Sequence, residues 1–279
     1  MRVGLSGAED FIAPWFGEML GDALVLIEKE DLAVKRKLDA KLAQCTCLIH
    51  LNGHPRDSGQ DRNDPNAVNE MRESAKLILN AKNRHQGLHV IMIGSLRVHR
   101  YEKEEMYSSE SALFPRDSAA KGQLWGEERA LEHASDTHPV SIIRSSNIQG
   151  VSINSGEGRG VIHDFVNQAS FGWIGVPGDG EDFLDPIHIT DFINAVMTVV
   201  ENPPPTRETI ALGGGQAVPI SEIANAISEN IGCDIQLWDK QENFVLGQVD
   251  DSEMKERLEF ASEVSIADMI GEAIESINS

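Results

Sequence analysis

The sequence predicts an α/β fold built on a doubly wound parallel sheet. Over the first half of the chain, short apolar runs alternate with segments of helical periodicity. The first run, residues 1–7, leads directly into a glycine turn, which is typical of the first strand of such a sheet. At 279 residues the chain is long enough for one large unit or two fused domains. Because strands that alternate with helices pair in parallel through right-handed crossovers, we expect one central sheet covered by helices.

The elements of the first half follow from periodicity and from their boundaries. Each apolar run is assigned to a strand because it is short and ends in turn or charged residues. Each longer segment is assigned to a helix where apolar residues recur every three or four positions. We expect strands at residues 1–7, 23–27, 46–51 and 89–95, and helices at 11–20, 33–44 and 67–84.

The second half begins with a long helix at 115–133 and a strand over 141–150, after which the pattern loosens into glycine-rich loops. A helix is expected at 191–201 with Thr190 as its N-cap, and a later helix with Ser221 as its cap. Ser265 and Asp268 stand at capping-box spacing before the last helix.

Two domains are therefore expected. A sheet domain comprises residues 1–150 plus the helix 191–201, and a smaller C-terminal lobe comprises residues 151–279. The lobe is expected to close over the strand ends of the sheet domain.

Composition excludes several classes of function. The net charge is −21, from 24 basic and 45 acidic residues, which argues against binding nucleic acid through its phosphates. No apolar run approaches the length of a membrane span, and the first residues include acids where a signal peptide needs an apolar core. We therefore expect a cytoplasmic protein with no membrane partner.

Cysteine and histidine usage predicts neither a disulfide framework nor a metal site. Cys45 and Cys47 alternate along one buried strand, where they should face the same side as reduced core residues. His50 lies within the same apolar strand, and His54 follows it in a loop, so the pair forms no helical chelate.

The region from Val90 to Gly150 carries the most specific pattern. It reads VIMIGSLRVH, then PRDSAAKGQLWGEERALEH, then SIIRSSNIQG. Taken in order, these segments resemble the extended short-chain dehydrogenase/reductase family, the NAD-dependent epimerases and dehydratases of nucleotide sugars. The resemblance covers nearly the whole chain and implies a Rossmann-like fold with a C-terminal substrate lobe. The family places two strands where this chain has room only for residues 23–27, so we expect a sheet that is one strand short.

The catalytic motif of the resembled family is incomplete here. The family carries Tyr-x-x-x-Lys followed four residues later by Glu. Counting back from Glu127, the tyrosine position is Ala119 and the lysine position is Gln123. Ser95 falls on the family's catalytic serine. In such enzymes a tyrosinate exchanges a proton with the sugar hydroxyl while hydride moves to or from the cofactor. Ala119 can exchange no proton, and Gln123 is neutral.

His99 is the candidate for a replacement acid or base, because it follows Ser95 closely and its side chain ordinarily titrates near neutrality. The chain contains two tyrosines, Tyr101 and Tyr107, both in the polar loop after Ser95. The competing hypothesis is that the loop folds back and places one of these tyrosines where the family's catalytic tyrosine would lie.

The cofactor turn is also altered. The family uses G-x-x-G-x-x-G so that backbone can approach a pyrophosphate at a helix N-terminus. Gly7 is retained, the second glycine is Asp10, and the third is Ala13. A carboxylate at Asp10 repels a phosphate by about 1–4 kcal/mol at a separation of about 4 Å, so it opposes NAD(P) binding in the usual manner.

The resemblance suggests further binding residues. Three acids follow the second strand, Glu28, Glu30 and Asp31, and each is a candidate for the ribose hydroxyls of NAD(P), with Asp31 the first choice. Asn69 matches an asparagine near the nicotinamide. Asn147 matches an asparagine that contacts substrate. Leu184 falls where many members place an arginine on the diphosphate of the sugar nucleotide.

Three functional hypotheses follow. The first is an epimerase/dehydratase-like protein that has lost nicotinamide redox catalysis and retains an interlobe cleft for a small polar, sugar-like ligand, as a binding protein or a non-redox isomerase or cyclase. Ser95, His99, Gln123, Asn147 and Asn69 would line that cleft. The second is an active NAD(P)-dependent nucleotide-sugar epimerase or dehydrogenase with rearranged motifs. The third is a structural or regulatory homodimer that pairs through the helices beginning near Val68 and Ala119.

Overall fold

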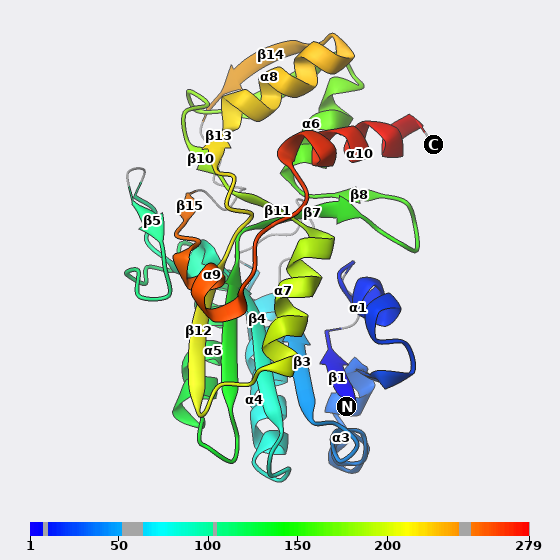
Figure 1. The fold of residues 1–279 in the computed structure, drawn as a ribbon, viewed down its shortest axis with the longest axis vertical. Helices are drawn as coiled ribbons and strands as arrows, with labels where there is room; N and C mark the ends of the chain where they lie inside the picture. Colours follow the sequence, from blue (N-terminus) through cyan, green and yellow to red (C-terminus); the bar gives the residue numbers. More distant parts are fainter. Residues whose placement is uncertain (8–10, 52–63, 103–104, 240–246, 279) are drawn as a thin grey trace. The chain divides into compact units, whose positions relative to one another are not determined.

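The computed structural model describes residues 1–7, 11–51, 64–102, 105–239 and 247–278 (Figure 1). These residues form two compact units. Unit 1 comprises Met1–Arg100, Ser111–Arg144 and Ala195–Ile210, and unit 2 comprises Tyr101–Glu110, Ser145–Asn194 and Ala211–Ser279. Relative to the predicted ranges, residues 101–110, 145–150 and 191–194 group with unit 2, and residues 202–210 group with unit 1.

Unit 1 is built on the predicted sheet. Six strands lie in the order β12-β6-β4-β3-β1-β2, and the pairs β1–β2, β1–β3 and β3–β4 are parallel. Between residues 11 and 51, all of which are described, β2 is the one strand that separates the first helix from β3, so it forms the sheet edge as the shortened-sheet prediction requires. The strands are β1 (Val3–Ser6), β2 (Leu24–Ile27), β3 (Cys47–Leu51), β4 (His89–Ser95), β6 (Val140–Ser145) and β12 (Arg207–Leu212).

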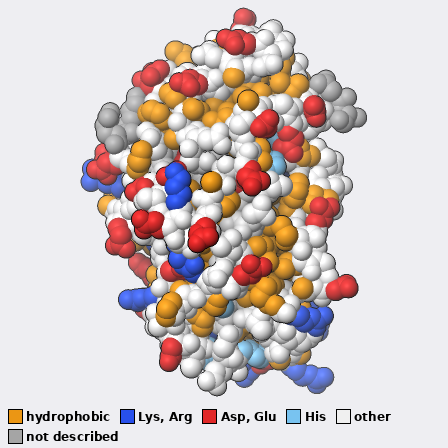
Figure 2. Space-filling view, in the orientation of Figure 1, with side chains coloured by type: hydrophobic (Ala, Val, Ile, Leu, Met, Phe, Trp, Pro, Cys, Tyr) orange, Lys and Arg blue, Asp and Glu red, His pale blue; other side chains and the backbone are white. Residues whose placement is uncertain are grey.

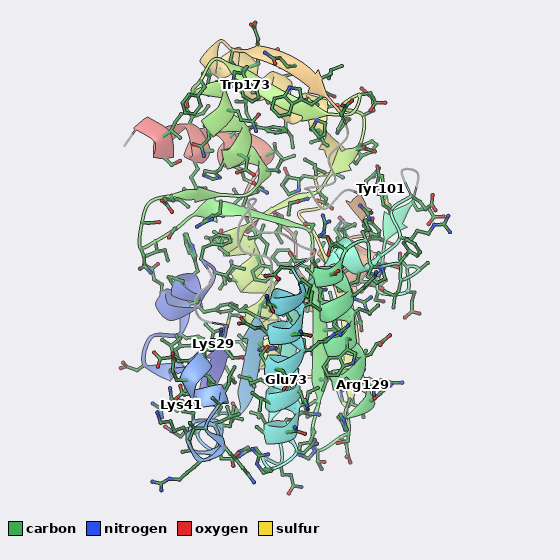
Figure 3. All side chains as sticks on the ribbon, turned by 180° about the vertical axis from the view of Figure 1, so that it is seen from behind. Lys29, Lys41, Glu73, Tyr101, Arg129 and Trp173 are labelled. Atoms are coloured by element: carbon green, nitrogen blue, oxygen red, sulfur yellow. The ribbon has the colours of Figure 1, made fainter. Side chains whose placement is uncertain are left out.

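The inner strands are buried along their whole length, which is typical of a parallel sheet covered on both faces. In Figure 1, α7 crosses in front of the sheet while α4 and α5 lie behind it, and Figure 3 shows α4 and α5 side by side from that direction. The helical elements of unit 1 are α1 (Ala13–Leu20), η1 (Gly21–Ala23), α2 (Lys29–Leu32), α3 (Lys35–Leu42), α4 (Pro65–Lys82), η2 (Leu96–Val98), α5 (Ser118–Glu132) and the second half of α7 (Ile189–Glu201).

The two long helices start at residues that suit helix N-termini. Asp64 accepts a hydrogen bond from the backbone N–H of Asn66 at 2.9 Å, and Pro65 occupies the first helical position of α4. Asp117 caps α5 in the same way, through the N–H of Ala120 at 2.7 Å. The helices approach closely at Gly122, because a Cβ there would lie 3.3 Å from a methyl carbon of Val68.

Unit 2 has its own core, formed by buried residues of α6, β9, α8 and α10. A three-stranded sheet has the order β11-β7-β8, and the pairs β10–β13, β14–β9 and β15–β5 complete the unit. Its helices are α6 (Val161–Ala169), the first half of α7, α8 (Ile220–Ile231), α9 (Ser252–Leu258) and α10 (Ile266–Asn278). Its strands are β5 (Met106–Tyr107), β7 (Asn147–Val151), β8 (Gly158–Arg159), β9 (Trp173–Pro177), β10 (Phe183–Leu184), β11 (Pro186–His188), β13 (Val218–Pro219), β14 (Asp234–Trp238) and β15 (Gln248–Val249).

Two predicted caps are wrong. Helix α7 begins at Ile189, so Thr190 lies within its first turn, and the His188 Nδ1 accepts from the Thr190 N–H at 3.3 Å instead. Helix α8 begins at Ile220, and the N–H of Ser221 donates to the carbonyl of Gly180.

The predicted capping box at Ser265 and Asp268 is confirmed. The Ser265 N–H donates to the Asp268 carboxylate at 3.2 Å, and the Asp268 N–H donates back to the Ser265 hydroxyl at 3.1 Å.

The cysteines are free thiols, as expected. Cys47 is buried within β3 and faces His89, but Cys45 precedes the strand and packs on the side of Leu48, so the expectation that both face one side of the strand is wrong. Burial raises the pKa of both thiols, which keeps them protonated and weakly reactive.

Among the described residues, no helix has the length and apolar character needed to cross a membrane. Figure 2 shows Asp and Glu side chains spread over the visible face, while no Lys or Arg is seen near its upper end.

Candidate functional site

Helix α5 holds Ala119 and Gln123, the residues that the sequence pattern predicts at the tyrosine and lysine positions of the resembled family. Ala119 and Gln123 are both buried on the side of α5 that faces the sheet. The Gln123 Nε2 donates to the backbone carbonyl of Ser95 at 3.0 Å and to the Glu127 Oε1 at 2.7 Å. This contact depends on Gly94, because a Cβ at that position would lie only 2.3 Å from Gln123 Nε2. The amide therefore joins the second turn of α5 to the end of β4.

Glu127 continues this chain of hydrogen bonds into the sheet. Its Oε2 accepts from the Arg144 Nε at 2.9 Å, and the side chains are 1% and 5% exposed. Arg144 lies in β6, two and four residues after Ile142 and Val140, whose side chains pack into the core beneath α4 and α5. Strand alternation thus points Arg144 at the same face as these apolar residues, where Glu127 neutralises it.

His99 lies at the far end of the same chain. Its Nε2 is 3.2 Å from Arg144 Nη1, and its Nδ1 is 3.0 Å from the carbonyl oxygen of Ser111. Since a carbonyl only accepts and a guanidinium only donates, Nδ1 carries the proton and the ring is neutral. Burial, together with the Arg144 charge, lowers the pKa of His99 to about 4. A fully buried imidazole with both nitrogens engaged has the features of a structural residue, and its predicted acid–base role gains no support from this geometry.

Ser95 ends β4 and is buried beside this chain. Its hydroxyl oxygen accepts from the N–H of Arg97 at 3.3 Å, which caps η2. The Arg97 guanidinium forms a buried ion pair with Asp117, with Nη2 at 2.6 Å from Oδ2. Asp117 therefore holds Arg97 and also caps α5, so both segments that flank the tyrosine position are fixed.

The cofactor turn begins as predicted. Gly7 has φ +86°, and a Cβ there would lie 2.7 Å from the carbonyl oxygen of Leu51, so only glycine fits. Asp10 lies outside the described residues. Next to the turn, the Ser6 hydroxyl is 2.7 Å from the His50 Nδ1. His50 is buried in β3, and its Nε2 has no hydrogen-bond partner among the described residues.

Asp31, the candidate for the ribose hydroxyls, is already engaged. Its Oδ2 accepts from the Lys41 Nζ at 2.5 Å and from the N–H of Glu28 at 2.9 Å, in a capping box that starts α2 (Figure 3 labels Lys41). The ammonium of Lys41 holds the pKa of Asp31 below its ordinary value. These contacts give Asp31 a structural role in α2.

The remaining predicted residues lie in different settings. Asn69 is exposed on α4, and Asn147 is half-buried at the start of β7, where its carbonyl accepts from the Gln149 Nε2 at 3.2 Å. Leu184 is fully buried in the core of unit 2, so the position matched to a phosphate-binding arginine is an apolar core position.

The two tyrosines have partners of their own. The Tyr101 hydroxyl donates to Asp182 Oδ1 at 2.6 Å within unit 2 (Figure 3 labels Tyr101). Tyr107 is buried in β5, where its ring would contact a Cβ placed at Gly247. These contacts do not favour the hypothesis that a loop tyrosine replaces the lost phenol.

The sequence did not single out Arg144, Arg97 or Asp117. Each is an ordinary charged residue in the sequence, and a charged residue inside the apolar run of β6 is the one signal that points to a buried partner. Among the described residues, no group of three His, Cys, Asp or Glu side chains is placed to hold a metal ion.

Fold and site together define a Rossmann-like α/β protein with a second, smaller unit. The sequence matches no family model and no curated protein. Solved structures match over the full chain. MoeE5 in complex with UDP-glucose and NAD is 16% identical with a TM-score of 0.82, over 100% of this chain and 99% of that chain. UDP-glucuronic acid 4-epimerase from Bacillus cereus, in complex with UDP-glucuronic acid and NAD, is 17% identical with a TM-score of 0.81, over 100% and 99%.

UDP-glucose 4-epimerase from Bifidobacterium longum, in complex with NAD+ and UDP, is 17% identical with a TM-score of 0.80, over 100% of this chain and 98% of that chain. The chain therefore has the fold of the NAD-dependent epimerases and dehydratases of the extended short-chain dehydrogenase/reductase family, which confirms the predicted fold.

Proposed function

We propose that this protein binds a sugar or sugar nucleotide and lacks the usual nicotinamide redox catalysis of its structural relatives. It acts as a binding protein or as a non-redox isomerase or cyclase. The observation that carries this proposal is the pair Ala119 and Gln123 on α5, where a proton-exchanging phenol and its lysine are replaced by a methyl group and a neutral amide.

The replacement is supported by the contacts of Gln123. Its amide is held by Ser95 and Glu127, so it is part of the packed interior. A neutral amide cannot lower the pKa of a hydroxyl as an ammonium does. His99 supplies no alternative, because burial and Arg144 keep its imidazole neutral and engaged.

The described residues fit a dinucleotide only in part. Gly7 has the left-handed backbone that allows close approach of a ligand to the turn, which suits a dinucleotide. Asp31 does not suit it, because its carboxylate is tied to Lys41 and Glu28. The proposed function therefore does not depend on a bound nicotinamide.

The ligand class comes from the structural relatives, which bind UDP-glucose, UDP-glucuronic acid or UDP. Because Leu184 replaces a cation with a buried apolar side chain, we expect the sugar to contribute more of the affinity here than the diphosphate. Asn147 is the candidate contact to a sugar hydroxyl.

The alternative is an active NAD(P)-dependent nucleotide-sugar epimerase or dehydrogenase. The observation in its favour is that the relatives carry NAD over the same full-length fold. Both functions are compatible with the fold, so whether the protein binds NAD(P) distinguishes them.

The test is the ultraviolet spectrum and native mass spectrum of freshly purified protein, followed by thermal shifts with NAD+, NADH, NADP+ and NADPH. We expect no bound nicotinamide and no stabilisation at micromolar cofactor. A tightly held dinucleotide with epimerisation of UDP-glucose would overturn the proposal.

A pair of variants sharpens this test. Asp10→Gly removes the carboxylate from the second glycine position, and we expect it to strengthen NAD+ binding about tenfold or more. Glu18→Gln, which removes an exposed carboxylate from α1, is the control and should leave NAD+ binding unchanged. Equal effects of the two variants would show that overall charge, and not the turn, limits binding.

A further inference from the structure

The outer face of strands β9 and β14 in unit 2 carries an exposed aromatic surface. The strands pair in parallel from Asp234 opposite Trp173 to Trp238 opposite Pro177. In β9, Ile174 and Val176 are buried in the core, so Trp173, Gly175 and Pro177 face outward. Paired residues share a face, which places Asp234, Gln236 and Trp238 beside them. Trp173 is labelled in Figure 3, where the two strands lie at the upper end of the view.

The two indoles form one shelf. Their ring centroids are 4.9 Å apart and the ring planes are tilted by 30°. A Cβ at Gly175 would lie 3.0 Å from Trp238 Cε2 and 3.2 Å from Trp173 Cζ3, so both rings lie over the bare backbone of that glycine. Trp238 nevertheless remains 45% exposed. Exposed apolar area of this kind is typical of a binding surface.

Polar groups border the shelf. The side chains of Asp234 and Gln236 are exposed and make no hydrogen bond within the described part of the chain. Together they offer donors and acceptors next to the rings, as a ligand with both apolar faces and hydroxyl groups requires.

Charge decides the class of ligand. Between Arg159 and Lys240 the sequence contains one Lys or Arg, Arg207, which belongs to unit 1. The shelf itself carries the carboxylate of Asp234. The Asp234 carboxylate repels an anionic ligand at the shelf, so a neutral ligand is favoured.

We propose that this shelf, formed by Trp173, Gly175, Trp238, Gln236 and Asp234, is a binding site for neutral carbohydrate. The C–H face of a pyranose ring packs on the indoles, and its hydroxyl groups bond to Gln236 and Asp234. The site takes uncharged glycan and is independent of the nucleotide-sugar function proposed above.

The test measures binding of maltohexaose, cellohexaose, xylohexaose and mannohexaose by calorimetry and by tryptophan fluorescence. We expect at least one of these to bind at millimolar concentration, Trp238→Ala to weaken it about tenfold or more, and Gln236→Ala to weaken it less. Circular dichroism verifies that each variant is folded.

Leu237→Ser is the matched control. Leu237 is 65% exposed on the same strand, but its side chain points to the opposite face from Trp238. Carbohydrate binding should survive this change.

Four results would overturn the proposal. The first is no binding of any of the four oligosaccharides at millimolar concentration. The second is an equal loss in Leu237→Ser and Trp238→Ala. The third is concentration-dependent self-association by light scattering that Trp238→Ala abolishes, which would make a second copy of the chain the occupant. Competition by UDP-glucose would assign the sugar to the nucleotide-sugar site and also count against the shelf.

Discussion

Arg144 donates from Nε to Glu127 Oε2 at 2.9 Å, and this ion pair joins the last central strand of unit 1 to the helix on which the family's catalytic residues would stand. Both partners have a second contact, Glu127 with Gln123 and Arg144 with His99. A buried charge pair is tolerated when its remaining hydrogen-bonding groups are also satisfied. The pair is therefore a fixed part of the structure.

Breaking this pair should cost far more than breaking a surface pair. Arg144→Met leaves the Glu127 carboxylate buried without its cation, and we expect the free energy of unfolding to fall by about 3–5 kcal/mol. Urea denaturation provides the measurement.

The surface control is Arg129→Met, which removes a pair with Glu132 at 2.8 Å whose side chains are half-exposed (Figure 3 labels Arg129). It should cost less than about 1 kcal/mol. Similar losses for Arg144→Met and Arg129→Met would contradict the buried-pair assignment.

Acid should destabilise the fold through His99. Its folded-state pKa is about 4, below its ordinary value of 6.5, so the unfolded chain takes up a proton first as the pH falls. The stability contribution is present above pH 6.5 and is lost as the pH falls toward 4. Near pH 5 the loss of stability amounts to about 2 kcal/mol.

The measurement is urea denaturation near pH 7 and near pH 5. His99→Gln should lose less stability than the wild type between these two conditions. His133→Gln, at an exposed position, should lose as much as the wild type. Burial also lowers the pKa of His50 to about 4. His50 therefore accounts for part of the loss of stability that His99→Gln still shows at the lower pH.

Substitution of Gly7 should lower the free energy of unfolding more than substitution of Gly87, which has nearly the same backbone conformation. Gly7 and Gly87 have φ of +86° and +84°, but a Cβ at Gly87 meets nothing within 4 Å. Gly87→Ala should cost about 1–2 kcal/mol from backbone strain alone.

Gly7→Ala adds a contact of 2.7 Å with the Leu51 carbonyl and should cost clearly more. Thermal denaturation of the two variants compares them directly. Equal melting temperatures would mean that Leu51 moves aside.

The buried side chain of Lys82 should destabilise the folded protein less as the pH rises. Its side chain is fully buried at the end of α4, with Nζ donating to the His133 carbonyl at 2.6 Å, and burial lowers its pKa to about 8. The folded state therefore disfavours the charged form. The stability contribution is present above the ordinary pKa of 10.5 and is lost as the pH falls through 8.

The comparison is between wild type and Lys82→Met, by urea denaturation near pH 7 and near pH 9. Relative to Lys82→Met, the wild type should gain stability at the higher pH. No change in the difference between the two proteins would contradict a buried ammonium.

The sequence predicts the order of elements in unit 1 well, because each apolar run or helical period is a local pattern. The predicted strand at 46–51 and helix at 67–84 differ from β3 and α4 by at most two residues at each end. The start of α7 was misjudged, because Thr190 is a good cap by composition while the side chain of His188 takes that role in three dimensions.

The site was less predictable, because its contacts connect residues far apart in the chain. Gln123 and Ser95 are 28 positions apart, and His99 and Arg144 are 45 apart. No spacing rule links such residues. The motif positions of Ala119 and Gln123 were found by resemblance, whereas the partners that hold Gln123 and His99 became visible only in the fold.

The chain of contacts from Ser95 through Gln123, Glu127 and Arg144 to His99 spans segments that are separate in sequence. If α5 separated from the sheet on its own, Arg144 in β6 and Glu127 on α5 would each lose the partner that neutralises its charge. The loss of these contacts raises the free energy of local opening. We therefore expect α5, the strands beneath it and the turn after β4 to unfold as one cooperative unit.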